Sequence, residues 1–106
     1  MYYIVRIAID MRFVWDEKKS RTNKTKHRIS FELATLVFDD PHAISLPDEF
    51  ENEERWLTIG RVKEFAALLV VHTLENEDNE EVIRIISARK ATRRETKAYE
   101  DQHKKP

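Results

Sequence analysis

The chain has 106 residues, room for one ordinary domain, and its 41% apolar content suffices for one modest core. It contains no cysteine, which excludes disulfides and thiolate chemistry, and one glycine, which excludes a Walker-type phosphate loop and a dinucleotide-binding fingerprint. Charged residues make up 37% of the chain, yet the formal net charge is only −1, which by itself argues against a nucleic-acid-binding protein.

We expect a single domain over residues 1–106, with a core of about 12–100 and a tail at 101–106. The apolar run within residues 1–10 is too short for a membrane helix and lacks the features of a secretory signal. It is either an added edge strand or an extension upstream of a start at Met11. We therefore expect a cytoplasmic protein with no membrane segment.

The predicted elements begin with a short strand at 12–15, whose apolar and β-branched side chains favour extended backbone. Asp16 can cap a helix over 17–26, and Ser30 can cap a second helix over 31–38, because their side-chain oxygens accept from free backbone N–H groups. Apolar side chains recur at helical spacing in the second helix, so it should bury one face.

Three strand candidates share a high content of β-branched and apolar side chains; they are residues 56–59, 66–74 and 82–87. Gly60 and the polar pair Lys63-Glu64 mark the first turn between them and the acidic run 75–81 marks the second, which predicts an antiparallel meander. The acidic, proline-broken stretch 42–55 is expected to be a connection. Thr92 and Glu95 form a capping box that opens a terminal helix. The sequence thus predicts an α+β fold: two N-terminal helices, a small antiparallel sheet and a C-terminal helix.

The charge is unevenly distributed. Residues 17–28 and 84–106 each carry a net charge of +5, whereas 39–55 carries −6 and 75–81 carries −5. The small total hides two basic and two acidic blocks, which either pair with each other as solvated faces or steer an anionic partner. Arg84 interrupts an apolar strand, where a cation must reach solvent or a partner.

Several stretches match one known family. They are residues 13–19 (FVWDEKK), Asn23 with 26–27 (KH), 29–32 (ISFE), 37–41 (VFDDP), 54–60 (ERWLTIG), 69–73 (LVVHT), 84–95 (RIISARKATRRE) and Tyr99. Over residues 13–99 the chain resembles the BrnT family, toxins of type II toxin–antitoxin systems. The stretch 84–95 is the most specific part of the match.

The resemblance implies a RelE-like fold and a ribonuclease that cleaves RNA, inhibits translation and arrests growth, with no cofactor or metal ion. It also implies neutralisation by a BrnA-like antitoxin with a ribbon-helix-helix part, in an expected heterotetramer. That complex would contact operator DNA only through the antitoxin. The four histidines fit the absence of a metal ion, since none lies close enough in sequence to another to form a local zinc pair.

Metal-independent RNA cleavage requires a base for the 2′-hydroxyl, cations for the negative phosphorane and an acid for the leaving 5′-oxygen. By position, we place Arg84 and Arg89 at the phosphate, since a guanidinium is always charged and binds two oxygens at once. Lys26 and His27, after the first helix, are the next candidates.

Glu54 is the candidate general base, and Arg55 would orient it or the phosphate. These two residues could equally form an ion pair at the start of a strand. His27 could bond a backbone carbonyl between the helices instead of taking part in catalysis. His72, a weaker candidate on the middle strand, could be a buried, hydrogen-bonded core residue.

Two positions depart from the family pattern. Arg28 stands where glycine is common after the Lys-His pair, and arginine costs about 1 kcal/mol or more there if φ must be positive. Glu75, two residues after Thr73, stands where an arginine is common and inverts the charge near the expected phosphate site. The alternatives to an active toxin are a catalytically impaired homologue that acts as an antitoxin-bound co-repressor and a stand-alone nucleic-acid-binding module.

Overall fold

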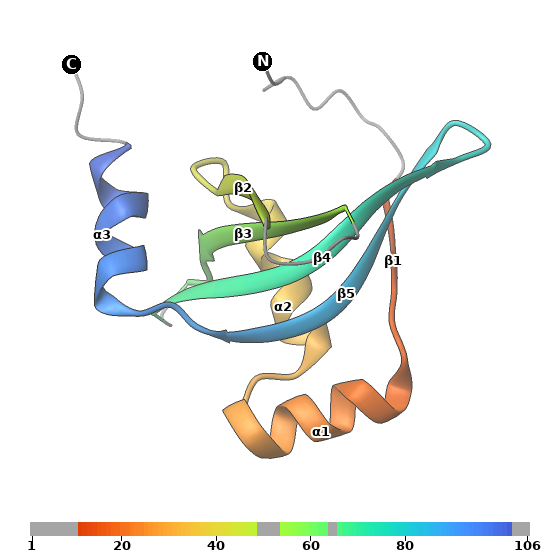
Figure 1. Cartoon of the computed structure of the whole chain (residues 1–106), viewed down its shortest axis with the longest axis horizontal. Coiled ribbons are helices and arrows are strands. Elements are labelled where there is room, and N and C mark those ends of the chain that lie inside the picture. The colour runs from red at the N-terminus through yellow and green to blue at the C-terminus, as the bar shows by residue number, and fades with distance from the viewer. Residues whose placement is uncertain (1–10, 49–53, 64–65, 103–106) are drawn as a thin grey trace.

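The computed structural model of the chain describes residues 11–48, 54–63 and 66–102. Within these residues a five-stranded mixed sheet has the order β1-β5-β4-β3-β2 (Figure 1). The strands are β1 (Met11–Val14), β2 (Ile44–Asp48), β3 (Arg55–Arg61), β4 (Ala67–Glu77) and β5 (Glu80–Lys90). The helices are α1 (Glu17–His27), α2 (Phe31–Thr35), the 3₁₀ helix η1 (Leu36–Asp39) and α3 (Arg93–Asp101). The α+β class is as predicted.

Local capping determines where the first helices begin, as the sequence predicts. The Asp16 carboxylate accepts from the backbone N–H groups of Lys18 and Lys19 at 2.8 and 3.2 Å, and these two hydrogen bonds lower the pKa of Asp16. Ser30 Oγ accepts from the N–H of Leu33 at 3.0 Å and begins α2. The second helix then tightens into η1 rather than continuing as one α-helix to residue 38.

Two apolar clusters lie on opposite faces of the sheet. Helices α1 and α2 with η1 cover the first face, whose cluster is Ile29, Phe31, Ala34, Val37, Val62, Leu68, Val70, Ile83, Ile85 and Ala88. Helix α3 covers one end of the second face, where Tyr99 packs with Ile59, Ala67 and Leu69. In β5, Ile83 and Ile85 are buried while Arg84 is exposed, so this cation reaches solvent as expected.

The sheet is larger and less regular than an antiparallel meander. Strands β3, β4 and β5 do form one, but β1 pairs with β5 in parallel. The predicted connection at 42–55 contains β2, which pairs antiparallel with β3. Pro47 lies within β2, and it is tolerated there because β2 is an edge strand. The predicted extra strand at 1–10 lies outside the described residues.

Gly60 does not mark a turn, because it lies inside β3. A Cβ atom at Gly60 would lie 2.8 Å from Val37 Cγ1 and 3.0 Å from the Val37 carbonyl oxygen. Glycine is needed here for the close approach of η1 to the sheet, which positions the helices on the first face.

The second predicted turn narrows to two residues, Asp78 and Asn79, both with positive φ (51° and 67°). This is the conformation that suits a two-residue hairpin, and both residue types tolerate it. Strands β4 and β5 are therefore longer than predicted, and their hairpin extends beyond the rest of the sheet (Figure 1). Arg12 of β1 reaches the acidic end of this hairpin and pairs with Glu77 and Glu80, each at 3.1 Å.

Candidate nucleic-acid interface

The free edge of β5 carries helix α1. Strand β1 pairs with β5 only as far as Arg84, so beyond that residue the β5 backbone has no strand partner on this side among the described residues. Asn23 of α1 takes the strand's place: its side-chain amide donates to the Ala88 carbonyl at 2.8 Å, and the Ala88 N–H donates to Asn23 Oδ1 at 3.1 Å. The same amide group donates to the Ile29 carbonyl at 2.9 Å. One buried side chain thus fixes a polar helix against the sheet.

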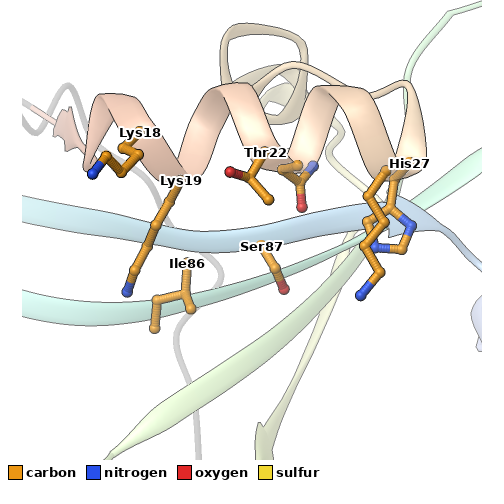
Figure 2. Close-up of a pocket in the computed structure, with 8 residues that line it drawn as sticks. Lys18, Lys19, Thr22, His27, Ile86 and Ser87 are labelled. Carbon is orange, nitrogen blue, oxygen red and sulfur yellow. The ribbon is translucent and has the colours of Figure 1, made fainter.

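An open groove of about 310 Å³ lies between α1 and β5 (Figure 2). Its lining residues are Lys18, Lys19, Thr22, Asn23, Lys26 and His27 of α1, with Ile86 and Ser87 of β5. Figure 2 shows Lys19 and His27 toward opposite ends of the helix, with Ile86 and Ser87 between them. None of these lining residues is acidic, so the groove presents three lysines and a histidine to an anionic ligand.

A β-bulge positions the strand side of this groove. In the β4–β5 register Val71 pairs with Ser87 and His72 pairs with Ile85, which leaves Ile86 as the extra residue. The bulge reverses the alternation of β5 at this point. Arg84 and Arg89, five positions apart, consequently lie on the same second face of the sheet, on either side of the two residues that line the groove.

Arg84 lies directly opposite Thr73 on the second face. Glu75 reaches both, because its Oε2 lies 3.9 Å from Arg84 Nε and accepts from Thr73 Oγ1 at 3.2 Å. The register of β3 with β4 pairs Trp56 with His72, which brings Arg55, one residue earlier, beside Thr73 from the other side. Arg55 and Arg84 therefore flank one threonine, and the carboxylate predicted to oppose phosphate binding lies beside Arg84.

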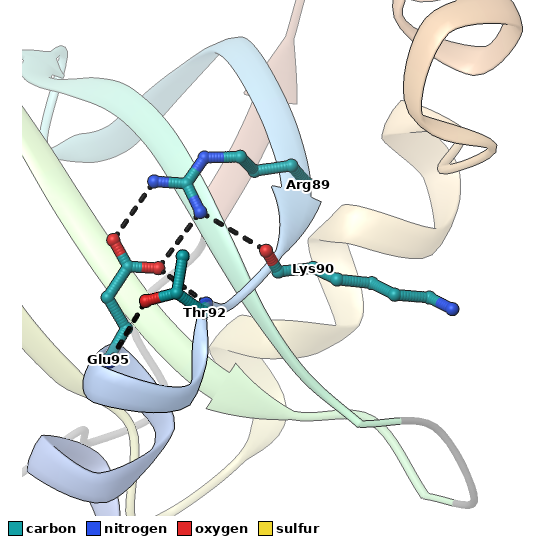
Figure 3. Close-up of polar contacts among 4 residues, drawn as sticks. All are labelled: Arg89, Lys90, Thr92 and Glu95. Carbon is teal, nitrogen blue, oxygen red and sulfur yellow. Dashed lines mark hydrogen bonds and ion pairs between the residues drawn. The ribbon is translucent and has the colours of Figure 1, made fainter.

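Arg89 is engaged by helix α3 (Figure 3). Its Nη1 and Nη2 donate to the two Glu95 oxygens, each at 2.9 Å, and Nη1 also donates to the Lys90 carbonyl. Glu95 also completes the predicted capping box with Thr92. Its hydrogen bond with Arg89 is the main cause of the lowered pKa of Glu95 and of the raised pKa of Arg89. In this structure the Arg89 guanidinium joins the end of β5 to the start of α3.

His72 is a core residue, as the structural alternative predicted. Its Nδ1–H donates to the Thr73 carbonyl at 3.1 Å, which leaves Nε2 to accept from Thr58 Oγ1 at 2.6 Å. Thr58 Oγ1 in turn lies 2.8 Å from Ser45 Oγ, and the Phe38 ring contacts the imidazole edge-on. Burial lowers the pKa of His72 to about 4, so the imidazole is neutral near pH 7.

The six predicted site residues thus fall into three places. Lys26 and His27 lie together in the groove, with His27 half-buried. Arg55 and Arg84 lie around Thr73 on the second face; Glu54, just before β3, is exposed. Arg89 binds α3.

Arginine at position 28 was predicted to be strained if its φ is positive. The Arg28 backbone is indeed left-handed (φ 64°, ψ 22°). Arg28 is the C-cap of α1, and its N–H donates to the Lys24 carbonyl at 2.8 Å. A glycine would adopt this conformation without strain.

Sequence reasoning did not identify five of the lining residues or the bonding role of Asn23; the five are Lys18, Lys19, Thr22, Ile86 and Ser87. The net charge of 17–28 was a signal for the lysines. Asn23 was marked only as one of the residues that match the family; its bonding role was not evident, because nearly every position of α1 is polar and the sequence does not reveal which one is buried.

Among the residues that the structure describes, no three His, Cys, Asp or Glu side chains are arranged to hold a metal ion. The described helices also include none that is long and apolar enough to cross a membrane.

Comparison with known proteins defines the class. Residues 15–95 match the family model described as the ribonuclease toxin BrnT of type II toxin–antitoxin systems. The chain is therefore a type II toxin by class, and within that class it belongs to the BrnT family. Its structure is similar to the crystal structure of the Brucella abortus ribonuclease toxin BrnT, with a TM-score of 0.59 and 28% identity over 78% of this chain and 99% of that one. None of the curated proteins searched matches the chain.

Proposed function

We propose that this BrnT-family protein is a metal-independent endoribonuclease whose cleavage of RNA inhibits translation and growth. The observation that carries the proposal is the groove between α1 and β5, which Lys18, Lys19, Lys26 and His27 line and where none of the described lining residues is acidic. A polyanionic strand is the ligand that such a surface favours, and phosphate contacts by lysine and arginine supply most sequence-independent affinity for nucleic acids.

The proposed reaction is an internal transfer at one phosphodiester. A base takes the 2′-hydroxyl proton, the 2′-oxygen bonds to phosphorus, the bond to the 5′-oxygen breaks, and an acid protonates that leaving oxygen. The products are a 2′,3′-cyclic phosphate and a 5′-hydroxyl. His27 is our candidate for a proton-transfer step, since it lies half-buried in the groove, and Lys26 would stabilise the phosphorane charge.

Arg84 is our candidate for phosphate binding beside the groove, because it lies on the same strand as Ile86 and Ser87 and is exposed. Glu54 remains an alternative base with Arg55 as its partner, but β4 separates their strand from β5. We leave Arg89 out of the catalytic set because both of its terminal nitrogens donate to Glu95.

The test is cleavage of single-stranded RNA by the purified protein, with and without a chelator. Wild type should produce cyclic-phosphate ends in both conditions, and His27→Ala and Arg84→Ala should each lose at least tenfold in rate. Arg94→Ala, which removes an exposed arginine from α3, is the charge-matched control. A wild type that cleaves no RNA, or variants that all cleave equally, would refute the proposal.

Type II membership implies an antitoxin partner. We propose that it is a BrnA-like protein with a ribbon-helix-helix part, bound in a heterotetramer that reaches operator DNA through the antitoxin. The cytoplasm is the proposed site of action. Co-expression followed by native mass measurement gives the stoichiometry directly.

A second candidate function is favoured by Glu75, whose carboxylate lies beside Arg84 and accepts from Thr73. In this alternative the protein is a catalytically impaired homologue that serves mainly as the antitoxin's co-repressor. Growth arrest on expression without an antitoxin would refute it, whereas tight operator binding by the complex together with no RNA cleavage would support it.

A further inference from the structure

Helix α1 carries a second row of cations on the flank away from the groove. The row consists of Arg21, Lys24 and Arg28, which together with Thr25 line a shallow depression of their own. Their spacing of three, four and seven positions puts them on one stripe of the helix. Lys19, Thr22 and Lys26 of the first groove repeat this spacing two residues earlier, which is about 200° around the helix axis. The two stripes therefore lie on opposite flanks of α1.

Several cations elsewhere on the described surface have carboxylate partners, which these three lack. Arg12, Arg61, Arg89 and Lys97 are each paired with a carboxylate within 4 Å. In the part of the chain that the structure describes, Arg21, Lys24 and Arg28 make no such pair, and all three are exposed. Charges left unpaired together on one stripe repel each other unless an anion lies among them.

Arg28 also occupies an unfavourable backbone conformation. Its left-handed φ of 64° is the conformation that favours glycine, and the Cβ of arginine is crowded there. The local chain reversal nonetheless leaves Arg28 in the stripe with Arg21 and Lys24. Strain of this kind persists where the side chain has a use that offsets it.

We propose that Arg21, Lys24 and Arg28 form a second phosphate-binding site for RNA, on the flank of α1 away from the catalytic groove. The inference rests on the proposed function in that its ligand is RNA. A strand bound on both flanks of α1 would be held by more phosphates than the groove alone contacts. The side-chain hydroxyl of Thr25, which lines the same depression, is available to donate to a phosphate oxygen.

The test measures binding rather than cleavage, so it does not depend on catalysis. The probe is a fluorescent 2′-O-methyl oligoribonucleotide, which has no 2′-hydroxyl to react, titrated between 50 and 200 mM salt. Arg28→Gly should raise the melting temperature by a few degrees, because it relieves the left-handed strain. It should also weaken binding severalfold at low salt and reduce the salt slope by about 0.7, the value for one single-strand phosphate contact.

Three further variants sharpen the test. Arg21→Ala with Lys24→Ala should weaken binding further, and Arg28→Lys should largely keep the salt slope because it keeps the charge. Lys97→Ala, which removes one cation from α3, should bind like wild type.

Variants that bind the probe as wild type does, while wild type cleaves RNA, would overturn this proposal and leave the proposed function standing. A wild type that cleaves no RNA but binds the probe through these residues would refute the proposed function and support the second phosphate-binding site. Loss of affinity for the antitoxin with unchanged RNA binding would show a protein-binding surface and would also overturn the proposal.

Discussion

Tyr99 Oη donates a 2.6 Å hydrogen bond to Asp40 Oδ2 and so joins α3 to the residue that follows η1. The Asp40 carboxylate also accepts from the backbone N–H groups of Arg61 and His42, at 2.7 and 2.8 Å. Burial opposes the ionisation of Asp40, but the bonds from Tyr99, Arg61 and His42 together lower its pKa. One carboxylate thus connects α3, β3 and the chain after η1.

Tyr99→Phe should therefore destabilise the protein by about 1–2 kcal/mol, because it removes a hydrogen bond to an ionised acceptor while leaving the ring buried. Urea unfolding measures the loss. In an Asp40→Asn background the same substitution should cost clearly less. An equal cost in both backgrounds would show that the ring packing, and not the hydrogen bond, makes the difference.

Gly60→Ala should cost about 1–3 kcal/mol, since the new methyl group would lie 2.8 Å from Val37 Cγ1 in a packed core. Combining it with Val37→Ala should recover part of the loss beyond additivity, because that change removes the nearest clashing atom. Thermal unfolding of the four proteins in this cycle checks the coupling, and strict additivity would contradict it.

The free energy of unfolding should decrease as the pH falls from about 6.5 to 4, in part because of His72. The pKa of His72 is about 4 when folded, so in this window the unfolded chain binds a proton that the folded chain does not. The resulting loss of stability is on the order of 3 kcal/mol at most. It vanishes above about pH 6.5, where His72 is neutral in both the folded and the unfolded chain. His72→Gln should flatten the pH dependence measured by urea unfolding; an unchanged slope would contradict the buried, neutral imidazole.

Glu75→Gln should raise the rate of RNA cleavage severalfold, because it removes the negative charge beside Arg84 and keeps an acceptor for Thr73. Glu77→Gln is the matched control. It changes the net charge equally on the same hairpin, but the Glu77 carboxylate pairs with Arg12 and not with Arg84. Initial rates on one RNA at fixed salt decide between them. Equal rates for both variants and wild type would show that Glu75 does not limit the activity.

Glu95→Ala tests the assignment of Arg89. The change removes the capping box and the bidentate partner of Arg89, so stability should fall by about 1–2 kcal/mol. RNA affinity per folded molecule should stay the same if Arg89 only anchors α3. A gain in affinity when the guanidinium is released would return Arg89 to the phosphate site.

The features that the sequence predicted well are those that short-range chemistry determines. Asp16, Ser30 and Thr92 cap helices as expected, because a capping side chain bonds to N–H groups two or three residues away. The burial of Ile83 and Ile85 beside an exposed Arg84 follows from simple alternation. The basic character of residues 17–28 was likewise visible in the sequence, and three lysines of this segment line the groove.

What the sequence did not reveal depends on contacts between distant residues. Gly60 resembles a turn residue until η1 is seen to lie against it. Pro47 argues against a strand unless that strand is known to be at the edge. The roles of Arg89 and Asn23 each require a partner from another element, Glu95 in one case and Ala88 in the other. The bulge at Ile86 cannot be predicted from the local sequence pattern, because it is defined by the register of β5 with β4.

The parallel pairing of β1 with β5 has a consequence for synthesis. Met11 pairs with Glu81, so β1 must wait for the synthesis of β5, which follows it far along the chain. Until then α1 also lacks Ala88, the backbone group that holds it. A polar helix of this length is unstable alone in water. The cationic groove can therefore assemble only after β5 has been synthesised.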